Sequence, residues 1–277
     1  MILDNRNQNK NIGKVDLGVL YTILILLAIG VVMIYSASSF YSMFHYNDSM
    51  FYLKKQGIMA VIGLVAMFFM MNFDYHRLKK ITPKLLIITI PLLIAVFFFP
   101  AVNGAKRWIQ LGGLSFQPSE LTKYVVVLFL ALSIDIKGDG IKDFWTGIVP
   151  YLALSGFFAA LVLAEKNLSI AAIIMIVTFI LLFISGGKIK HLFGIVLPTL
   201  LTLAIFFIFS SDYRRARMLN FIDPWKDAAG DGYQLIQSFY ALGSGGITGL
   251  GLGQSRQKTL YMPEPHNDFI FSIIGEE

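Results

Sequence analysis

Long uncharged apolar runs recur along most of this 277-residue chain, and they constrain its fold more than any other feature. A helix needs about 20 mainly apolar residues to cross a bilayer, and only helices and closed barrels satisfy their own backbone there. Hydrophobic residues make up 56% of the chain and charged residues 14%, compared with roughly 25% charged residues in soluble domains. The sequence therefore predicts an all-α, polytopic membrane helical bundle that forms a single domain over residues 1–277.

Seven of the runs are predicted to be complete crossings. They cover approximately residues 17–36, 56–73, 85–102, 118–134, 144–164, 168–184 and 192–211. The first run is longer than the roughly 7–15 residues of a signal-peptide core, which favours an uncleaved crossing. An eighth run starts at Phe269 and has only nine residues, so we expect further crossings beyond Glu277.

Lysine and arginine are unequally distributed between the two sides of the predicted bundle. The tail of residues 1–16, with Arg6, Lys10 and Lys14, and the loops on its side hold 11 of them, whereas the short loops opposite hold 5. Because cytoplasmic loops are enriched in these residues, the tail is predicted to be cytoplasmic. Seven crossings then make residues 212–267 a large extracytoplasmic loop, polar and rich in glycine.

The net charge of +6 lies mainly in short loops beside apolar runs. This distribution is typical of anchoring at an anionic membrane face, so no nucleic-acid partner is expected. The absence of cysteine excludes disulfides, thiol catalysis and cysteine metal sites, and the four histidines show no metal-ligand spacing.

Two pairs of charged residues stand at helical spacing. Glu120 and Lys123 share one face of the fourth run, where charges usually face a bundle interior or a wet cavity and pair with each other. They form either a structural ion pair or part of a substrate cavity. Arg214 and Arg217 follow the seventh run and either anchor to lipid headgroups or clamp a phosphate group.

Asp268 stands where the polar loop meets the last apolar run. It is either the N-cap of the eighth helix or, because Asn267 can cap equally well, a carboxylate free for chemistry. The glycine-rich stretch 243–253 is interpreted as turns in preference to a ligand-admitting loop. Asp268, the two arginines and the segment 103–123 are all predicted on the outer side, so one site could draw on them all.

Several ordered motifs resemble the SEDS family (shape, elongation, division, sporulation) of FtsW, RodA and SpoVE. They are GAKRWI at 104–109, QPSE at 117–120 with Lys123, YR..R...F..PW at 213–225, GYQLIQS at 232–238, G.GLGQS.QK..Y.PE.H.DFIF at 249–271, and the final GEE. The stretch GQSRQKTLYMPEPHNDF is most similar to the FtsW and SpoVE branch. One departure is Asn167, which stands where many members carry an acid, so a role for an acid there is not expected.

The resemblance implies a peptidoglycan glycosyltransferase that polymerises lipid II on the outer face of the cytoplasmic membrane, in cell division or sporulation. By motif, Asp268 matches the family's essential aspartate, and Glu120 and Lys123 match charged residues of its central cavity. Members of the family work with a class B penicillin-binding protein and other division or sporulation membrane proteins.

The residues suit this chemistry. A carboxylate that takes the proton of an acceptor hydroxyl accelerates such a transfer by roughly 10²–10⁴-fold. The charge that develops on a lipid pyrophosphate needs cations, and Lys106, Arg107, Arg214 and Arg217 lie on the predicted outer side. A divalent cation (Mg or Mn) is compatible with this chemistry, although the sequence shows no dedicated metal site.

Two other functions fit the same membrane chain. A lipid II flippase needs polar groups along the whole crossing path, whereas these charges gather at the outer side. A non-enzymatic scaffold of the division machinery leaves the grouping of Asp268, Glu120 and the arginines without a purpose. The sequence therefore favours the inverting glycosyltransferase.

Overall fold

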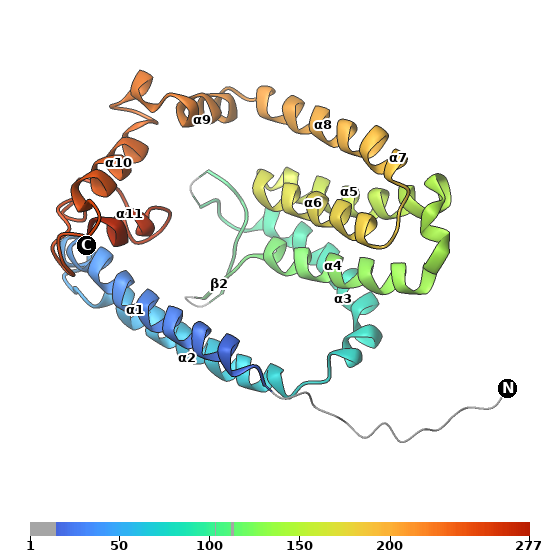
Figure 1. The fold of residues 1–277 in the computed structure, drawn as a ribbon, viewed down its shortest axis with the longest axis horizontal. Coiled ribbons are helices and arrows are strands. Elements are labelled where there is room, and N and C mark those ends of the chain that lie inside the picture. Colours follow the sequence, from blue (N-terminus) through green and yellow to red (C-terminus); the bar gives the residue numbers. More distant parts are fainter. Residues whose placement is uncertain (1–14, 103, 112–113) are drawn as a thin grey trace. The chain divides into compact units, whose positions relative to one another are not determined.

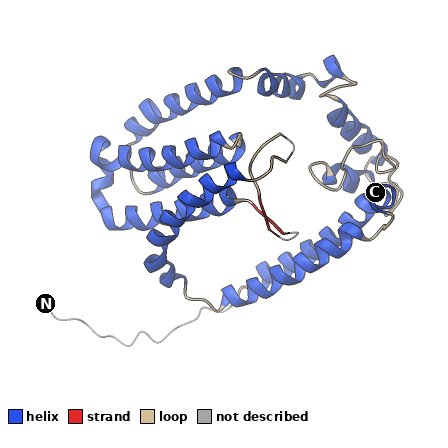
Figure 2. Ribbon diagram, turned by 180° about the vertical axis from the view of Figure 1, so that it is seen from behind, coloured by secondary structure: helices blue, strands red, loops and turns tan. Residues whose placement is uncertain are grey.

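The structure is a computed structural model that describes residues 15–102, 104–111 and 114–277. The chain divides into two compact units, one made of Met1–Phe73 with Ser211–Glu277 and the other of Asp74–Ser210. Both units are built almost entirely from helices (Figures 1 and 2). The all-α, polytopic membrane fold is thus confirmed, while the grouping of the chain into a single domain stays a prediction.

The first unit is organised on a long helix pair, α1 (Leu17–Tyr46) and α2 (Phe51–Met71), which lie side by side (Figure 1). Asp16 caps α1 by accepting a hydrogen bond from the Val19 backbone at 3.2 Å. The unit is completed by four shorter elements, α9 (Asp212–Ile222), the 3₁₀ turn η6 (Pro224–Asp227), α10 (Tyr233–Gly245) and α11 (Ile270–Glu276). Its small core joins α1, α10 and α11 through Ala37, Ala241, Met262 and Ile273.

The second unit is a helical bundle around α4 (Pro118–Lys137), α5 (Val149–Ala164) and α6 (Leu168–Ile184). The α5–α6 pair forms the tight hairpin expected from its short connection, and α3 (Leu78–Ala95) packs on α4. The remaining elements are η1 (Tyr75–Arg77), η2 (Val96–Phe98), β1 (Ile109–Leu111), β2 (Leu114–Phe116), η3 (Gly138–Lys142), η4 (Phe144–Ile148), α7 (Ile189–His191), η5 (Leu192–Val196) and α8 (Leu197–Phe209).

Helices stand at all seven predicted crossings. Among the described residues, 5 helical stretches are long and apolar enough to span a membrane, namely Leu17–Tyr46, Phe51–Met71, Tyr75–Phe98, Phe144–Ala164 and Ile189–Phe209. The fully apolar α6 is shorter, with 17 residues, and α4 carries charged residues in its first turns. Neither α2 nor α8 has a buried residue, as expected for apolar helices that face lipid.

The structure differs from the sequence-based expectations in several places. The first helix extends to Tyr46 instead of residue 36. The third helix begins at Leu78 instead of residue 85, because lysines that mark the edge of an apolar run do not end a helix. The predicted loop 212–267 contains α9 and α10, whose mixed polar and apolar composition hid them from a search for uncharged runs. A two-stranded antiparallel hairpin, β1–β2, precedes α4. The basic residues Arg6, Lys10 and Lys14 of the predicted tail, and Asn103, lie outside the described residues.

Candidate active site

Asp268 lies in the first unit, two residues before α11. Its side chain is exposed, and within the described residues it has no hydrogen-bond or ion-pair partner. The N-cap of α11 is Phe269, without a side-chain capping bond, and the Asn267 side chain donates to Glu264 at 2.8 Å. The N-cap interpretation of Asp268 is therefore wrong, and the carboxylate faces solvent.

The segment before Asp268 is nevertheless held firmly. The Tyr233 hydroxyl of α10 donates to the carbonyl of Tyr261 at 2.9 Å. The His266 ring is 8% exposed, and its centroid lies 4.0 Å from that of Tyr52 and 5.3 Å from that of Tyr41. Burial lowers the pKa of His266, which favours the neutral ring. Asp268 is thus an exposed acid on an anchored segment.

Two glycines of the stretch 243–253 are required by close packing within the first unit. A Cβ atom at Gly245 would lie 1.9 Å from the carbonyl oxygen of Gly275. At Gly249, with a φ of 74°, a Cβ atom would lie 2.3 Å from the carbonyl oxygen of Glu277. These glycines serve turns and contacts of the chain with itself, in line with the preferred interpretation.

A buried ion pair lies behind Asp268, and the sequence analysis did not predict it. Lys258 Nζ is 2.6 Å from Glu277 Oε1, and the two side chains are 8% and 2% exposed. The Ser36 hydroxyl of α1 accepts a hydrogen bond from Lys258 at 3.0 Å and lies 2.8 Å from the Glu277 carboxylate oxygens. Every charge in this group therefore has a partner.

The neighbouring carboxylate of Glu276 holds the loop that contains Lys258. It accepts hydrogen bonds from the backbone of Arg256 at 3.0 Å and of Gln257 at 3.3 Å. The hydroxyls of Ser255 and, at 3.2 Å, Ser244 donate to it as well. The two glutamates belong to the GEE motif and Lys258 belongs to the QK motif. Membership of these motifs was the only feature of the sequence that pointed to this group.

Arg214 and Arg217 lie on α9, in the same unit as Asp268. Arg214 is half-buried and Arg217 is exposed. The adjacent Arg215 pairs with Asp212 at 3.0 Å on the surface. The helix follows α8 after only two residues, so in the chain its arginines come soon after the end of the candidate membrane span Ile189–Phe209.

Glu120 and Lys123 lie in the first turns of α4 in the second unit. Lys123 Nζ is 2.6 Å from Glu120 Oε2, which confirms the pairing predicted from their spacing. The Glu120 side chain is 47% exposed and that of Lys123 21%, so the pair is accessible and not enclosed. Lys123 Nζ also lies 5.2 Å from the centroid of the Tyr124 ring.

Lys106 and Arg107 precede β1 in the second unit, and both contact backbone carbonyls. Lys106 is exposed and donates to Phe97 at 2.9 Å. Arg107 Nε donates to the carbonyl of Glu165 at 3.3 Å, and its Nη2 donates to that of Lys166. Arg107 therefore ties its loop to the turn between α5 and α6.

Glu165, in that turn, is a buried acid that the sequence analysis missed. It is 1% exposed, and within the described residues neither carboxylate oxygen has a hydrogen-bond partner. Burial raises the pKa of Glu165 to about 7, against the opposing effects of Ser119 and Arg107. The next position of interest, Asn167, caps α6 by accepting from the Ile170 backbone at 3.3 Å.

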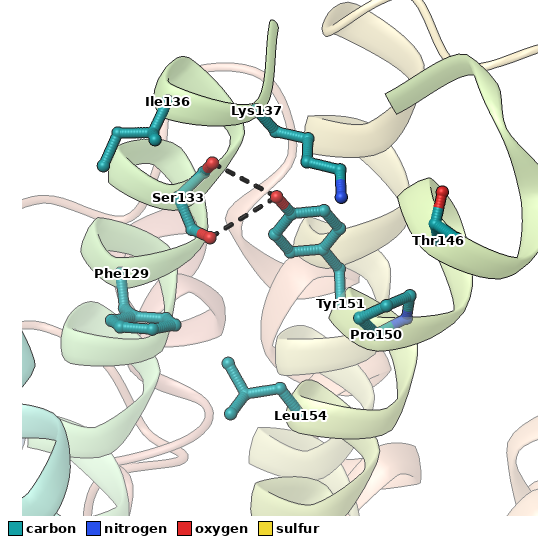
Figure 3. A pocket seen from close by; sticks show the side chains of 8 residues that line it. All are labelled: Phe129, Ser133, Ile136, Lys137, Thr146, Pro150, Tyr151 and Leu154. Atoms are coloured by element: carbon teal, nitrogen blue, oxygen red, sulfur yellow. Dashed lines mark hydrogen bonds between the residues drawn. The ribbon is translucent and has the colours of Figure 1, made fainter. Parts of the chain in front are cut away.

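A pocket of about 460 Å³ lies at the opposite end of α4 from Glu120 (Figure 3). The Tyr151 hydroxyl crosses it and donates to the Ser133 carbonyl at 3.1 Å. The pocket is lined by Phe129, Ser133, Ile136, Lys137, Thr146, Pro150, Tyr151 and Leu154. It contains none of the predicted site residues.

The described residues do not fit a dedicated metal site. Nowhere among them do three or more His, Cys, Asp or Glu side chains lie together in a way that would hold an ion. No step of the reaction is therefore assigned to Mg²⁺ or Mn²⁺.

Known proteins are similar to this sequence over nearly its whole length. The FtsW/RodA/SpoVE cell cycle protein family matches residues 17–277. The chain belongs to this family. A probable peptidoglycan glycosyltransferase FtsW of Geobacter sp. (strain M18) is 41% identical over 266 residues, which cover 95% of this chain and 72% of that protein. Stage V sporulation protein E of Bacillus subtilis (strain 168) is 38% identical over 268 residues, with coverages of 95% and 72%.

Solved structures of the FtsW/RodA/SpoVE family share the fold. A chain of a peptidoglycan synthase complex, solved to show how polymerization and crosslinking are coordinated, has a TM-score of 0.70 and 29% identity, over 95% of this chain and 70% of that chain. The rod shape determining protein RodA of Thermus thermophilus has a TM-score of 0.56 and 26% identity, over 69% of this chain and 58% of that chain. The resemblance first drawn from short motifs is thus confirmed.

Proposed function

We propose that this chain is a peptidoglycan glycosyltransferase that polymerises lipid II in cell division or sporulation, with Asp268 as its general base. The observation that carries the proposal is the state of Asp268. It is an exposed carboxylate with no partner among the described residues, on a segment fixed by its neighbours, at the position of the family's essential aspartate. The names of the FtsW relatives support the reaction.

The proposed reaction is a single displacement. The acceptor sugar hydroxyl forms a bond to the anomeric carbon of the donor, and its proton passes to the Asp268 carboxylate. The bond from that carbon to the pyrophosphate oxygen breaks, and its electron pair leaves with the lipid pyrophosphate. One displacement inverts the anomeric carbon, and it requires one base and no second carboxylate as nucleophile.

Cations are needed where the pyrophosphate leaves. In the first unit the exposed Arg217 and the half-buried Arg214 are suited to this task, because guanidinium groups bind phosphate oxygens with two parallel hydrogen bonds. In the second unit the exposed ammonium of Lys106 and the pair of Glu120 with Lys123 are the proposed substrate contacts. Arg107 contributes mainly by fixing the Lys106 loop to the α5–α6 turn.

The proposal includes an orientation and a partner. The N-terminus is cytoplasmic and Asp268 lies on the extracytoplasmic side, as the distribution of basic residues predicts. The partner is a class B penicillin-binding protein that crosslinks the new strand. The likeness to a chain of a peptidoglycan synthase complex that coordinates polymerization with crosslinking supports such a partner.

The test is Asp268→Asn in the full chain, assayed with its partner and labelled lipid II. Because Asp268 has no partner among the described residues, the change is expected to leave thermal stability and lipid II binding intact. Polymer formation is expected to fall by roughly 10²-fold or more, because an amide cannot accept the proton. The exposed Asp231→Asn is the control and is expected to polymerise normally. Near-normal polymer from a well-folded Asp268→Asn protein would contradict the proposal.

The same assay separates the enzyme from the transporter. A flippase moves labelled lipid II between leaflets without making polymer, whereas a polymerase lengthens glycan in detergent, where there are no leaflets. Orientation is tested by single-cysteine labelling in this cysteine-free chain. Ile247→Cys suits this purpose because Ile247 is fully exposed, and labelling from the cytoplasmic side alone would refute the proposed orientation.

A further inference from the structure

The chain around Asp268 forms a loop that is closed by the buried ion pair. Asp268 lies ten residues after Lys258 and nine residues before Glu277. The contact of 2.6 Å between Lys258 Nζ and Glu277 Oε1 joins the two ends of this segment. Asp268 itself makes no contact of its own among the described polar groups, so the two flanking segments determine where its carboxylate lies.

Both flanking segments are anchored at the same place. On one side, α11 has only 7 residues and is therefore about 10 Å long, so a shift of Glu277 is transmitted directly to Asp268. On the other side, the segment 255–258 is bound through its backbone to the carboxylate of Glu276. Ser36 adds a contact from α1, the first long helix, to both charges of the pair.

Two further residues of the loop are packed within the first unit, which adds to this anchoring. Met262 is 1% exposed in the core with Ile273 of α11, and His266 packs against Tyr41 and Tyr52. A loop that is packed at these points and closed at its base is restrained in its movement. Its base therefore sets the position and direction of the exposed Asp268 carboxylate that it carries.

We propose that Lys258 and Glu277 are positioning residues for Asp268. Their ion pair, with the hydroxyl of Ser36, closes the loop 258–277 and holds the Asp268 carboxylate at the distance that proton transfer from the acceptor requires. This inference rests on the proposed function. It assigns the QK and GEE motifs a task in the chemical step, since a carboxylate displaced by about 1 Å can lose 10²-fold in rate.

The experiment measures kcat and KM for lipid II polymerisation by the full chain with its partner. Lys258→Met and Glu277→Gln are each expected to lower kcat by roughly 10- to 100-fold with KM nearly unchanged. The reversed pair, Lys258→Glu with Glu277→Lys, is expected to recover most of the lost kcat. Lys54→Met is the matched control, because Lys54 forms a similarly short pair of 2.7 Å with Asp48 in the same unit but is 64% exposed. It is expected to keep the wild-type kcat.

A second variant serves if the single changes do not give folded protein. Ser36→Ala removes one neutral group that contacts both charges, and it is expected to lower kcat by about fivefold, the equivalent of one hydrogen bond. Hydrogen exchange gives a readout without activity. Amides of residues 259–269 are expected to exchange faster in Ser36→Ala than in wild type. In Lys54→Met they are expected to exchange at the wild-type rate.

Three outcomes distinguish the two proposals. Wild-type protein without polymerase activity, or an active Asp268→Asn, overturns the proposed function. An active wild type, an inactive Asp268→Asn and folded Lys258→Met and Ser36→Ala proteins with normal kcat overturn only this inference. A loss confined to KM also overturns it, because that result assigns the pair to substrate binding instead of to the position of the base.

Discussion

The two units each contain a lysine–glutamate pair with the same closest N–O distance, 2.6 Å, in very different surroundings. Glu120 and Lys123 are neighbours on one turn of α4 and are 47% and 21% exposed. Lys258 and Glu277 are 19 residues apart and almost fully buried. An exposed pair such as the first adds little to the free energy of unfolding. In the buried second pair, removing one charge leaves the other without a counter-charge, which is strongly destabilising. Distance alone therefore says little about what an ion pair contributes.

A third acid sharpens the comparison. Glu165 is buried, as is the side chain of Glu277, yet within the described residues the carboxylate oxygens of Glu165 have no hydrogen-bond partner. Burial without a partner favours the neutral form of a carboxyl group, whereas burial beside an ammonium favours the charged form. The same residue type is therefore expected to respond in opposite ways to pH in the two units.

The largest expected effect comes from breaking the buried pair. Lys258→Met leaves the Glu277 carboxylate buried without its counter-charge, and it is expected to lower the free energy of unfolding by about 3–5 kcal/mol. The measurement is denaturant or thermal unfolding of the purified protein in detergent or nanodiscs. A loss below about 1 kcal/mol would show that the pair contributes no more than a surface pair does.

The next effect is the pH dependence from Glu165. Its pKa is raised from 4.5 to about 7 in the folded protein, so between these values the unfolded chain loses the proton and the folded chain keeps it. The contribution of Glu165 to the free energy of unfolding is therefore fully present below pH 4.5. It falls as the pH rises to about 7 and is constant above that, with a total change of up to about 3 kcal/mol.

Glu165→Gln isolates this contribution, because the amide keeps the shape of the side chain and does not titrate. The free energy of unfolding of wild type relative to the variant is expected to fall between pH 4.5 and about 7, so that the variant is the more stable protein at pH 8. A difference that stays constant from pH 4 to pH 8 would show that Glu165 titrates as an exposed acid does.

A smaller effect is expected from the pair on α4. In a double-mutant cycle of Glu120→Gln and Lys123→Met, the coupling energy is expected to be at most about 1 kcal/mol, because both side chains are accessible. A coupling of several kcal/mol would mean that the membrane encloses the pair. Both single variants would then fold poorly, because each leaves one enclosed charge without its partner. The double variant would fold better than either single variant.

The smallest effect is expected at the surface pair of the first unit. Lys54 and Asp48 are 64% and 38% exposed, and their separation is 2.7 Å. Lys54→Met is expected to leave the unfolding midpoint unchanged within error at moderate salt, because water and ions screen such pairs. A clear destabilisation would undermine its use as the control for Lys258→Met.

The sequence by itself determined the features that depend on neighbouring residues. Uncharged runs of about 20 residues predict membrane helices, and the bounds of α6 and of the stretch 144–164 are those expected. The pairing of Glu120 with Lys123 follows from their spacing on one helix face. The family likewise follows from the order of short motifs, since a motif is a local pattern.

Only the tertiary structure decided the features that depend on residues far apart. The contacts of Lys258 with Glu277 and Ser36 join positions 19 and 222 residues apart, and no period in the sequence marks them. The burial of Glu165 depends on packing around the α5–α6 turn, because its own sequence shows only an acid at the end of an apolar run. Asp268 could equally have been an N-cap by its sequence context. It became an exposed acid because α11 begins one residue later than that context suggests, and packing, not propensity, determines where so short a helix starts.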